Sequence, residues 1–264
     1  MEKKYILTDE TKVVNDKTLH RIKALKSFST VQCGDLGGWV ESESNLSQKG
    51  NCWIYDNAKV YDNAKVYDNA KIFGRAEIYN NAIILDNAKI FGRAEIYNNA
   101  IILDNAKVYE DVRVYDKAKV GDCALVYDNA EICDNATIGG NAKIHGNAKI
   151  HDSATVSGDA IICENAEIFG YAIVYGTAMI RGNAKIKSCS DYIVFKNWWS
   201  SGRYFTWTRS NNMWSVGCFY GTGDELITKA YKDSKRSGKE YKRIVKYVKA
   251  ISSKNFFKKL FCNL

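Results

Sequence analysis

The sequence predicts a mainly β protein whose middle is a parallel β-helix with triangular coils of 18 residues. Residues 51–188 divide into 23 consecutive hexapeptides without a gap. The fourth residue of every hexapeptide is Ile or Val, and the second is Ala in 21 of them. The segment 69–86 recurs letter for letter at 87–104, so three hexapeptides are tolerated as one complete structural unit.

Each position of the hexapeptide has a physical role in such a coil. The β-branched fourth residue points inward from the middle of a short strand, where it packs well. Stacked coils, about 4.8 Å apart, then build three aliphatic columns. The Ala lies near a corner with no room for a larger side chain. Most hexapeptides close on Asp, Gly or Asn, and Asn and Gly tolerate the positive φ of a bend.

Residues 1–50 are predicted to form an N-terminal β cap, because one coil cannot bury its own aliphatic side chains and the end of the stack must be covered. Strands are expected over Tyr5–Thr8 and Thr18–Leu25. The segment 34–40 leads into the first coil. We expect Trp39 and Trp53 to cover the open end of the Ile/Val columns.

Residues 189–264 are predicted to form a small α+β domain, since the hexapeptide stops after Ser188. Three strands and two helices are expected, at Tyr192–Trp199, Arg203–Arg209, Met213–Tyr220, about Asp224–Lys232, and from Ser237 onward. Ser237 and Glu240 are expected to form a capping box at the start of the second helix.

The charge distribution, the cysteine content and the lack of a long apolar run indicate which compartment the protein occupies. The net charge is +8, yet residues 225–264 carry 12 Lys/Arg against 3 Asp/Glu, so the rest of the chain is close to neutral. The 8 cysteines form no C-x-x-C pair, and the N-terminus does not resemble a signal peptide. Without an apolar run of about 18 residues, no transmembrane segment is expected. The sequence therefore predicts a reduced, cytoplasmic protein.

The aromatic strands and basic helices of 189–264 predict a surface for a macromolecular partner, either nucleic acid or protein. Lysines and arginines bind phosphates, and aromatic rings stack on bases. The alternative is that the tryptophans form a core and the lysines are merely solvated. The candidate partner-binding residues are Trp198, Trp199, Arg203, Trp207, Arg209, Lys239, Lys242, Arg243 and Lys246.

The outward positions of the coils differ between the three sides. One side carries an aromatic column that reaches from Tyr55 to His145, flanked by the lysines at 71, 89 and 107. Another side carries an apolar patch that should be covered, either by the terminal domain or by a second subunit. Of these alternatives, coverage by a second subunit predicts a homo-oligomer, which we expect. The patch consists of Ile83, Leu85, Ile101 and Leu103.

The hexapeptide pattern of residues 51–188 resembles the hexapeptide-repeat family, which implies a left-handed β-helix. That family includes acyltransferases, γ-class carbonic anhydrases and proteins without assigned chemistry. The segments LHRIKALKSF at 19–28 and GDLGGWVESESNLSQKGNCWIYDNA at 34–58 resemble the start of uncharacterised phage and prophage proteins of this class. The C-terminal segment resembles the small domain that often follows their repeat.

The sequence contains few candidate catalytic residues. The resemblance implies a histidine base beside a cleft between subunits of a trimer, commonly shaped by a loop that leaves the coil. No loop interrupts 51–188, and the weak candidates are His145 and His151, on adjacent sides of the prism. Carbonic anhydrase relatives need three converging histidines, and the chain has only 3 in total, with no convincing third beside these two. No metal site is therefore predicted.

The sequence favours a non-enzymatic structural or binding protein without a cofactor. In this hypothesis a rigid β-helix presents the basic, aromatic domain to a partner, as a phage-encoded host-interaction or counter-defence factor would do. The alternative hypothesis is a hexapeptide acyltransferase that uses coenzyme A at a groove between subunits.

Overall fold

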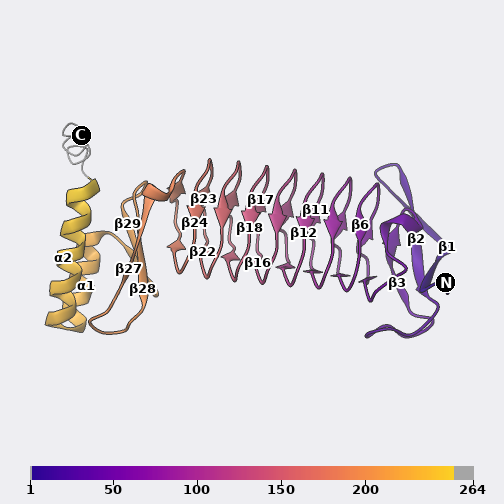
Figure 1. Cartoon of the computed structure of the whole chain (residues 1–264), viewed down its shortest axis with the longest axis horizontal. Coiled ribbons are helices and arrows are strands. Elements are labelled where there is room, and N and C mark those ends of the chain that lie inside the picture. The colour runs from indigo at the N-terminus through magenta and orange to yellow at the C-terminus, as the bar shows by residue number, and fades with distance from the viewer. Residues whose placement is uncertain (1, 253–264) are drawn as a thin grey trace.

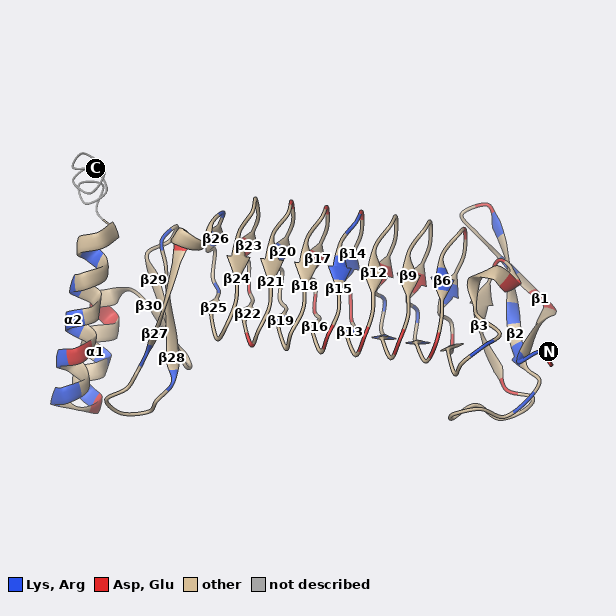
Figure 2. Cartoon of the chain, in the orientation of Figure 1, with Lys and Arg blue, Asp and Glu red and all other residues tan. Residues whose placement is uncertain are grey.

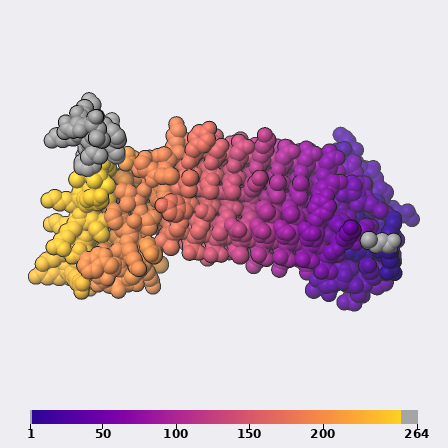
Figure 3. All heavy atoms as spheres, viewed as in Figure 1, coloured from indigo at the N-terminus to yellow at the C-terminus, as the bar shows by residue number. Residues whose placement is uncertain are grey.

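The computed structural model describes residues 2–252, which form a rod with a β-helix in the middle and a smaller unit at each end (Figures 1 and 3). The N-terminal unit occupies the indigo end, and the C-terminal unit occupies the yellow end. The predicted mainly β fold, with an N-terminal β cap and a C-terminal α+β unit, is confirmed.

Each hexapeptide contributes one strand of two residues, and the strands build three parallel sheets that we name sides 1, 2 and 3. Side 1 consists of β4 (Trp53–Ile54), β7 (Lys71–Ile72), β10 (Lys89–Ile90), β13 (Lys107–Val108), β16 (Leu125–Val126), β19 (Lys143–Ile144), β22 (Ile161–Ile162) and β25 (Met179–Ile180). Side 2 contains β5 (Lys59–Val60), β8 (Glu77–Ile78), β11 (Glu95–Ile96), β14 (Arg113–Val114), β17 (Glu131–Ile132), β20 (Lys149–Ile150), β23 (Glu167–Ile168) and β26 (Lys185–Ile186). Side 3 contains β6 (Lys65–Val66), β9 (Ile83–Ile84), β12 (Ile101–Ile102), β15 (Lys119–Val120), β18 (Thr137–Ile138), β21 (Thr155–Val156) and β24 (Ile173–Val174).

The inward columns are in the predicted register. Ile90 pairs with Ile72 on one neighbouring strand and with Val108 on the other. All three side chains are fully buried, as are the alanines two positions before them. The left-handed parallel β-helix with coils of 18 residues therefore forms as the hexapeptides predict.

The corners are held by the residue that closes each hexapeptide. Every such residue from Asp56 to Gly182 has a positive φ. A carboxylate at this position accepts a hydrogen bond from the backbone N–H one coil further on, as Asp56 does from Gly74 at 3.0 Å. This bond satisfies a backbone donor that the strand ladder leaves free. Aspartate is therefore suited to the corner both by its backbone and by its side chain.

The N-terminal unit extends side 2. It contains β1 (Tyr5–Val14), β2 (Lys17–Ala24), β3 (Leu36–Val40) and the short 3₁₀ helix Glu43–Asn45. The prediction that Trp39 and Trp53 cover the end of the columns is wrong. Trp39 pairs with Lys59 and Trp53 with Lys71, so both occupy outward positions of the register. Trp39 packs against Leu19 outside the prism, and Trp53 is buried by cap residues.

The C-terminal unit is an antiparallel sheet followed by two helices. Its elements are a 3₁₀ helix (Cys189–Asp191), β27 (Tyr192–Lys196), β28 (Tyr204–Thr208), β29 (Met213–Val216), β30 (Phe219–Gly221), α1 (Gly223–Asp233) and α2 (Lys235–Ser252). The third predicted strand is divided in two by a turn at Gly217, where φ is +56°. The part of the predicted domain after residue 252 lies outside the described residues.

The predicted capping box at Ser237 is wrong. Ser237 lies inside α2, and its N–H donates to Ser234 Oγ at 3.0 Å, so Ser234 caps the helix. A capping box forms instead at α1, between Thr222 and Glu225. Neither α1 nor α2 is long and apolar enough to cross a membrane.

The buried columns should dominate the stability of the rod. We expect Ile90→Ala to lower the free energy of unfolding by about 2–5 kcal/mol, because it removes buried methyl groups and leaves a cavity between two occupied rungs. Lys89→Ala is the matched control, since the neighbouring side chain points outward. Chemical denaturation followed by circular dichroism measures both variants. Equal losses for the two would contradict the inward assignment.

Candidate functional site

His145 lies on side 1, directly after β19. Its ring stacks on Tyr127 with 4.7 Å between centroids and 4° between planes. Nδ1 lies 3.6 Å from Asp128 Oδ2. Nε2 has no hydrogen-bond partner among residues 2–252. A carboxylate at one ring nitrogen fixes the orientation of an imidazole and leaves the other nitrogen to exchange a proton.

His151 lies on side 2, after β20, and both of its ring nitrogens are engaged. Nε2 lies 3.1 Å from Glu167 Oε1, and Nδ1 lies 3.5 Å from Asp152 Oδ1. The ring stacks on Phe169. A hydrogen bond from Lys185, supported by His151, holds the pKa of Glu167 below its usual value. His151 is therefore embedded in an ion-pair network and offers no free nitrogen.

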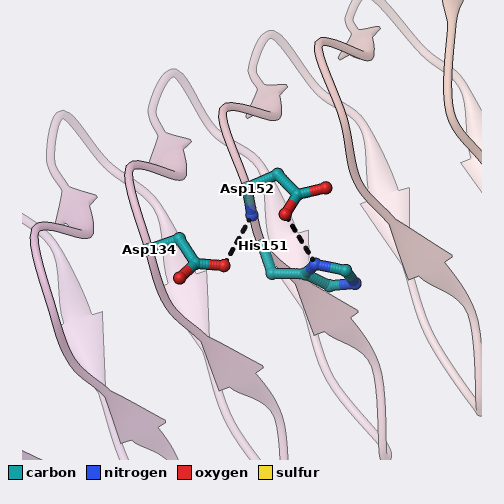
Figure 4. A group of neighbouring side chains, drawn as sticks. All are labelled: Asp134, His151 and Asp152. Atoms are coloured by element: carbon teal, nitrogen blue, oxygen red, sulfur yellow. Dashed lines mark hydrogen bonds and ion pairs between the residues drawn. The ribbon is translucent and has the colours of Figure 1, made fainter.

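The two histidines lie on different sides of the prism, so they do not form a joint site. His151 forms a cluster with Asp134 and Asp152, whose potential ligand atoms lie within 4.8 Å of one another (Figure 4). However, Asp134 Oδ2 accepts the N–H of Asp152 at 2.9 Å, the same corner bond that Asp128 makes with Gly146. The repeat thus explains the cluster without a ligand.

The residue after His145 in the side 1 column is Cys163, one rung further on. Its side chain is 7% exposed, and burial raises the pKa of its thiol to about 11. The thiol is therefore protonated at neutral pH and is not an activated nucleophile. His145 is thus the one imidazole of this column, and its Nε2 has no hydrogen-bond partner among residues 2–252.

The tryptophans of the C-terminal unit are mostly core residues. Trp199 and Trp207 are 6% and 1% exposed, and they pack with Phe205 and other apolar residues of the sheet and helices. Trp207 Nε1 also donates to Asn212 at 3.0 Å. We therefore correct the prediction for these two residues, because a partner cannot reach them in this fold.

The other candidate residues of this unit are accessible to different degrees. Trp198 is 68% exposed and lies 5.9 Å from the guanidinium of Arg236. Arg203 is exposed, and Arg209 is half-buried. Figure 2 shows repeated basic residues along α2. The exposed cations of α2 that the sequence singled out are Lys239, Lys242, Arg243 and Lys246.

The apolar patch lies on side 3, where Ile83 and Ile101 pair across adjacent strands. These two residues, with Leu85 and Leu103, are half-buried by their neighbours. The described part of the C-terminal unit stands at the end of the rod, several coils away, so it does not cover them (Figure 1). Coverage by a second subunit stays a prediction.

A cavity that the sequence did not reveal lies where the β-helix meets the C-terminal unit. Its volume is about 500 Å³, and Tyr175, Tyr192 and Tyr204 are among its lining residues. The available sequence signal was Tyr175, at an outward position where the preceding coil of side 3 has the smaller Ser157.

Comparison with known proteins gives one partial similarity. No protein-family profile matches the chain. A segment of 38 residues is 50% identical to a protein named "Uncharacterized acetyltransferase YdcK" of Escherichia coli (strain K12). The segment covers 14% of this chain and 12% of that protein, so the chain spans only a small part of its relative. The match supports the hexapeptide-repeat class, and the resemblance to phage proteins stays a prediction.

The burial of the thiols predicts their reactivity. Cys33, Cys123 and Cys218 are exposed, whereas Cys52 and Cys163 are buried. At neutral pH we expect iodoacetamide to modify the two buried thiols roughly tenfold more slowly, because burial protects them and raises their pKa. Mass spectrometry of peptides after timed alkylation measures the rates, with the denatured chain as control. Equal rates for Cys163 and Cys123 in the folded protein would contradict the packing.

Proposed function

We propose that this chain is an acyltransferase of the hexapeptide-repeat class, which transfers an acyl group from a coenzyme A thioester. The observation that carries the proposal is His145, with Asp128 at Nδ1 and an unpartnered Nε2. The partial similarity to a protein named an acetyltransferase supports it. This similarity is why we place the enzyme ahead of the binding protein that the sequence alone favoured.

In this mechanism the stack on Tyr127 restrains the plane of the imidazole ring, and Asp128, held at the corner by the Gly146 N–H, places a negative charge 3.6 Å from Nδ1. Nε2 accepts the proton of the attacking hydroxyl or amine as that group adds to the thioester carbonyl. The same proton is then available to the departing thiolate. A general base must first be within reach of the proton that it removes. The imidazole of His145 meets this condition, because 28% of its side-chain surface is exposed.

The proposed enzyme is a homo-oligomer, because one flat side of a prism cannot enclose a substrate. A second subunit would supply the opposite wall of a groove beside side 1. The apolar patch at Ile83, Leu85, Ile101 and Leu103 is the proposed contact, since it is left without cover by the described terminal units. Burial of such a patch is a common driving force for association.

A second candidate function is binding of a polyanionic macromolecule by the C-terminal unit. The exposed cations of α2 support it, together with Trp198 beside Arg236 at the same unit. In this function the β-helix acts as a rigid spacer, and host interaction or counter-defence is the proposed setting. The two candidate functions depend on different parts of the chain, His145 on the β-helix and α2 in the C-terminal unit, so substitutions can test them separately.

The acyltransferase proposal predicts that His145→Ala abolishes turnover of acetyl-coenzyme A. We expect a loss of at least about 100-fold, as for removal of a general base. His151→Ala is the matched control and should retain activity, because neither of its nitrogens is free. Release of free thiol, assayed with a panel of amine and hydroxyl acceptors, measures both. Thiol release from the wild-type chain no faster than the uncatalysed rate would refute the proposal.

The binding proposal predicts that heparin retention depends on α2. We expect one triple variant to elute at lower salt than the wild type, because three cations that release counterions are lost. The substitutions are Lys239→Gln, Lys242→Gln and Lys246→Gln. A control variant with the same net charge should elute at higher salt than the α2 triple variant. Its substitutions on the β-helix are Lys117→Gln, Lys119→Gln and Lys143→Gln. Identical elution of the two variants would exclude a specific role for α2.

A further inference from the structure

Three lysines stack directly on one another on side 1. Lys89 pairs in register with Lys71 on one adjacent strand and with Lys107 on the other. Adjacent strands lie about 4.8 Å apart, well within the distance over which charges interact at physiological salt. Like charges directly opposite one another on neighbouring strands are destabilising. The column therefore has an electrostatic cost in the free protein.

No ion pair among residues 2–252 offsets this cost. No Asp or Glu oxygen of residues 2–252 lies within ion-pair distance of Nζ of Lys71, Lys89 or Lys107. The one partner found for these amines is Ser29 Oγ, 3.1 Å from Lys71 Nζ.

The equivalent positions on side 2 show the opposite pattern. There, Glu131 accepts ion pairs from both Arg113 and Lys149, at 3.3 Å each. Lys185 pairs with Glu167 at 2.7 Å in the same column. Opposite charges thus pair over most of the side 2 column, with Glu77 beside Glu95 as the exception, whereas the three lysines of side 1 form no ion pair within residues 2–252.

The lysine column lines a groove of about 570 Å³. The other lining residues are four asparagines at the first position of successive coils, from Asn51 to Asn105, and Ser29 of the N-terminal unit. Asn51 Nδ2 donates to Asn69 Oδ1 at 3.0 Å, so the amides form a ladder along the groove. An amide NH₂ has two donors, and the ladder uses one of them. The lining therefore offers cations and donors and contains no carboxylate.

No aromatic residue lines the groove, and the first three rings of the neighbouring aromatic column stack on one another. Phe73 stacks on Phe91 with 4.7 Å between centroids and 6° between planes, and Tyr55 stacks on Phe73 at 4.3 Å. Nucleic acid bases therefore cannot stack between Tyr55, Phe73 and Phe91. Recognition in this groove must rest on charge and hydrogen-bond donors, which favours phosphates over bases.

We propose that the groove on side 1 binds a chain of two or three linked phosphates. Three lysines on successive rungs span about 10 Å, a length that suits a short phosphate chain better than an isolated anion. Such a ligand would remove the repulsion between the lysines and use the free amide donors. The proposal does not depend on acyl transfer, since free oligophosphate, a nucleoside triphosphate and the diphosphate of coenzyme A all carry this chemistry.

The test is isothermal titration calorimetry of the full chain with inorganic tripolyphosphate. The wild-type chain should bind it saturably, and affinity should fall as salt is raised. The groove variant combines Lys71→Gln, Lys89→Gln and Lys107→Gln. We expect it to bind at least about tenfold more weakly, because it loses the three charged contacts. The control with equal loss of charge combines Lys117→Gln, Lys119→Gln and Lys143→Gln, which lie on the β-helix outside the groove lining, and it should bind as the wild type does.

Thermal unfolding separates loss of binding from loss of folding. Without ligand and at low salt, the groove variant should melt at the same temperature as the wild type or higher, because its like charges are gone. Tripolyphosphate should raise the melting temperature of the wild type and of the β-helix control, but not of the groove variant. Equal binding by the two variants, or binding of a single-stranded oligonucleotide without binding of tripolyphosphate, would overturn the proposal.

Two further titrations identify the source of the phosphates. Tighter binding of adenosine triphosphate than of tripolyphosphate, lost in the groove variant, indicates a nucleotide ligand. Tighter binding of coenzyme A, lost in the same variant, indicates that the groove holds the diphosphate of the acyl donor. Turnover of acetyl-coenzyme A that is unaffected by the groove substitutions, with no tripolyphosphate binding by the wild type, would reject the groove and leave the acyltransferase proposal intact.

Discussion

The structure depends on the stacking of β-branched side chains one rung apart inside the prism. An inward Ile or Val is covered only by the coils above and below it, so no coil is stable alone and each added coil completes its neighbour. This requirement fixes the second and fourth positions of the hexapeptide and the positive φ at its end. It leaves the outward positions free, and the three sides have diverged there.

Because the register repeats every 18 residues, outward side chains at equivalent positions of successive coils lie directly above one another. A tyrosine above a tyrosine gives stacked rings, as in Tyr79 and Tyr97 at 5.0 Å. Alternating charges give ion pairs, and like charges on neighbouring rungs repel one another. A histidine in such a ladder inherits its stacked environment, and its catalytic capacity then depends on whether a carboxylate of the next coil engages its Nε2. This difference separates His145 from His151, although both occupy the same hexapeptide position.

The sequence predicted the parts of the fold that local repetition controls. Register, inward columns and the placement of His145 and His151 on different sides all follow from counting residues by six and eighteen. It failed where packing between distant segments decides. Trp39 pairs with Lys59 and lies outside the prism, and Trp207 is buried by helices that composition alone described as a basic surface. The cavity at Tyr175 arises from a junction between two units that the period does not describe.

The exact duplication of 69–86 at 87–104 adds one coil to the β-helix, and it indicates which surface sites would survive such an addition. It copies Lys71 as Lys89 and Ile83 as Ile101, so one added coil extends the lysine column on side 1 and the apolar patch on side 3 by one rung. It also moves His145 one rung, about 4.8 Å, further from the N-terminal unit. A site assembled between His145 and the N-terminal cap would lose its geometry by this step. Surfaces that act by linear repetition keep their geometry. His145 also keeps its geometry, because its partners Tyr127 and Asp128 both lie on the immediately preceding coil.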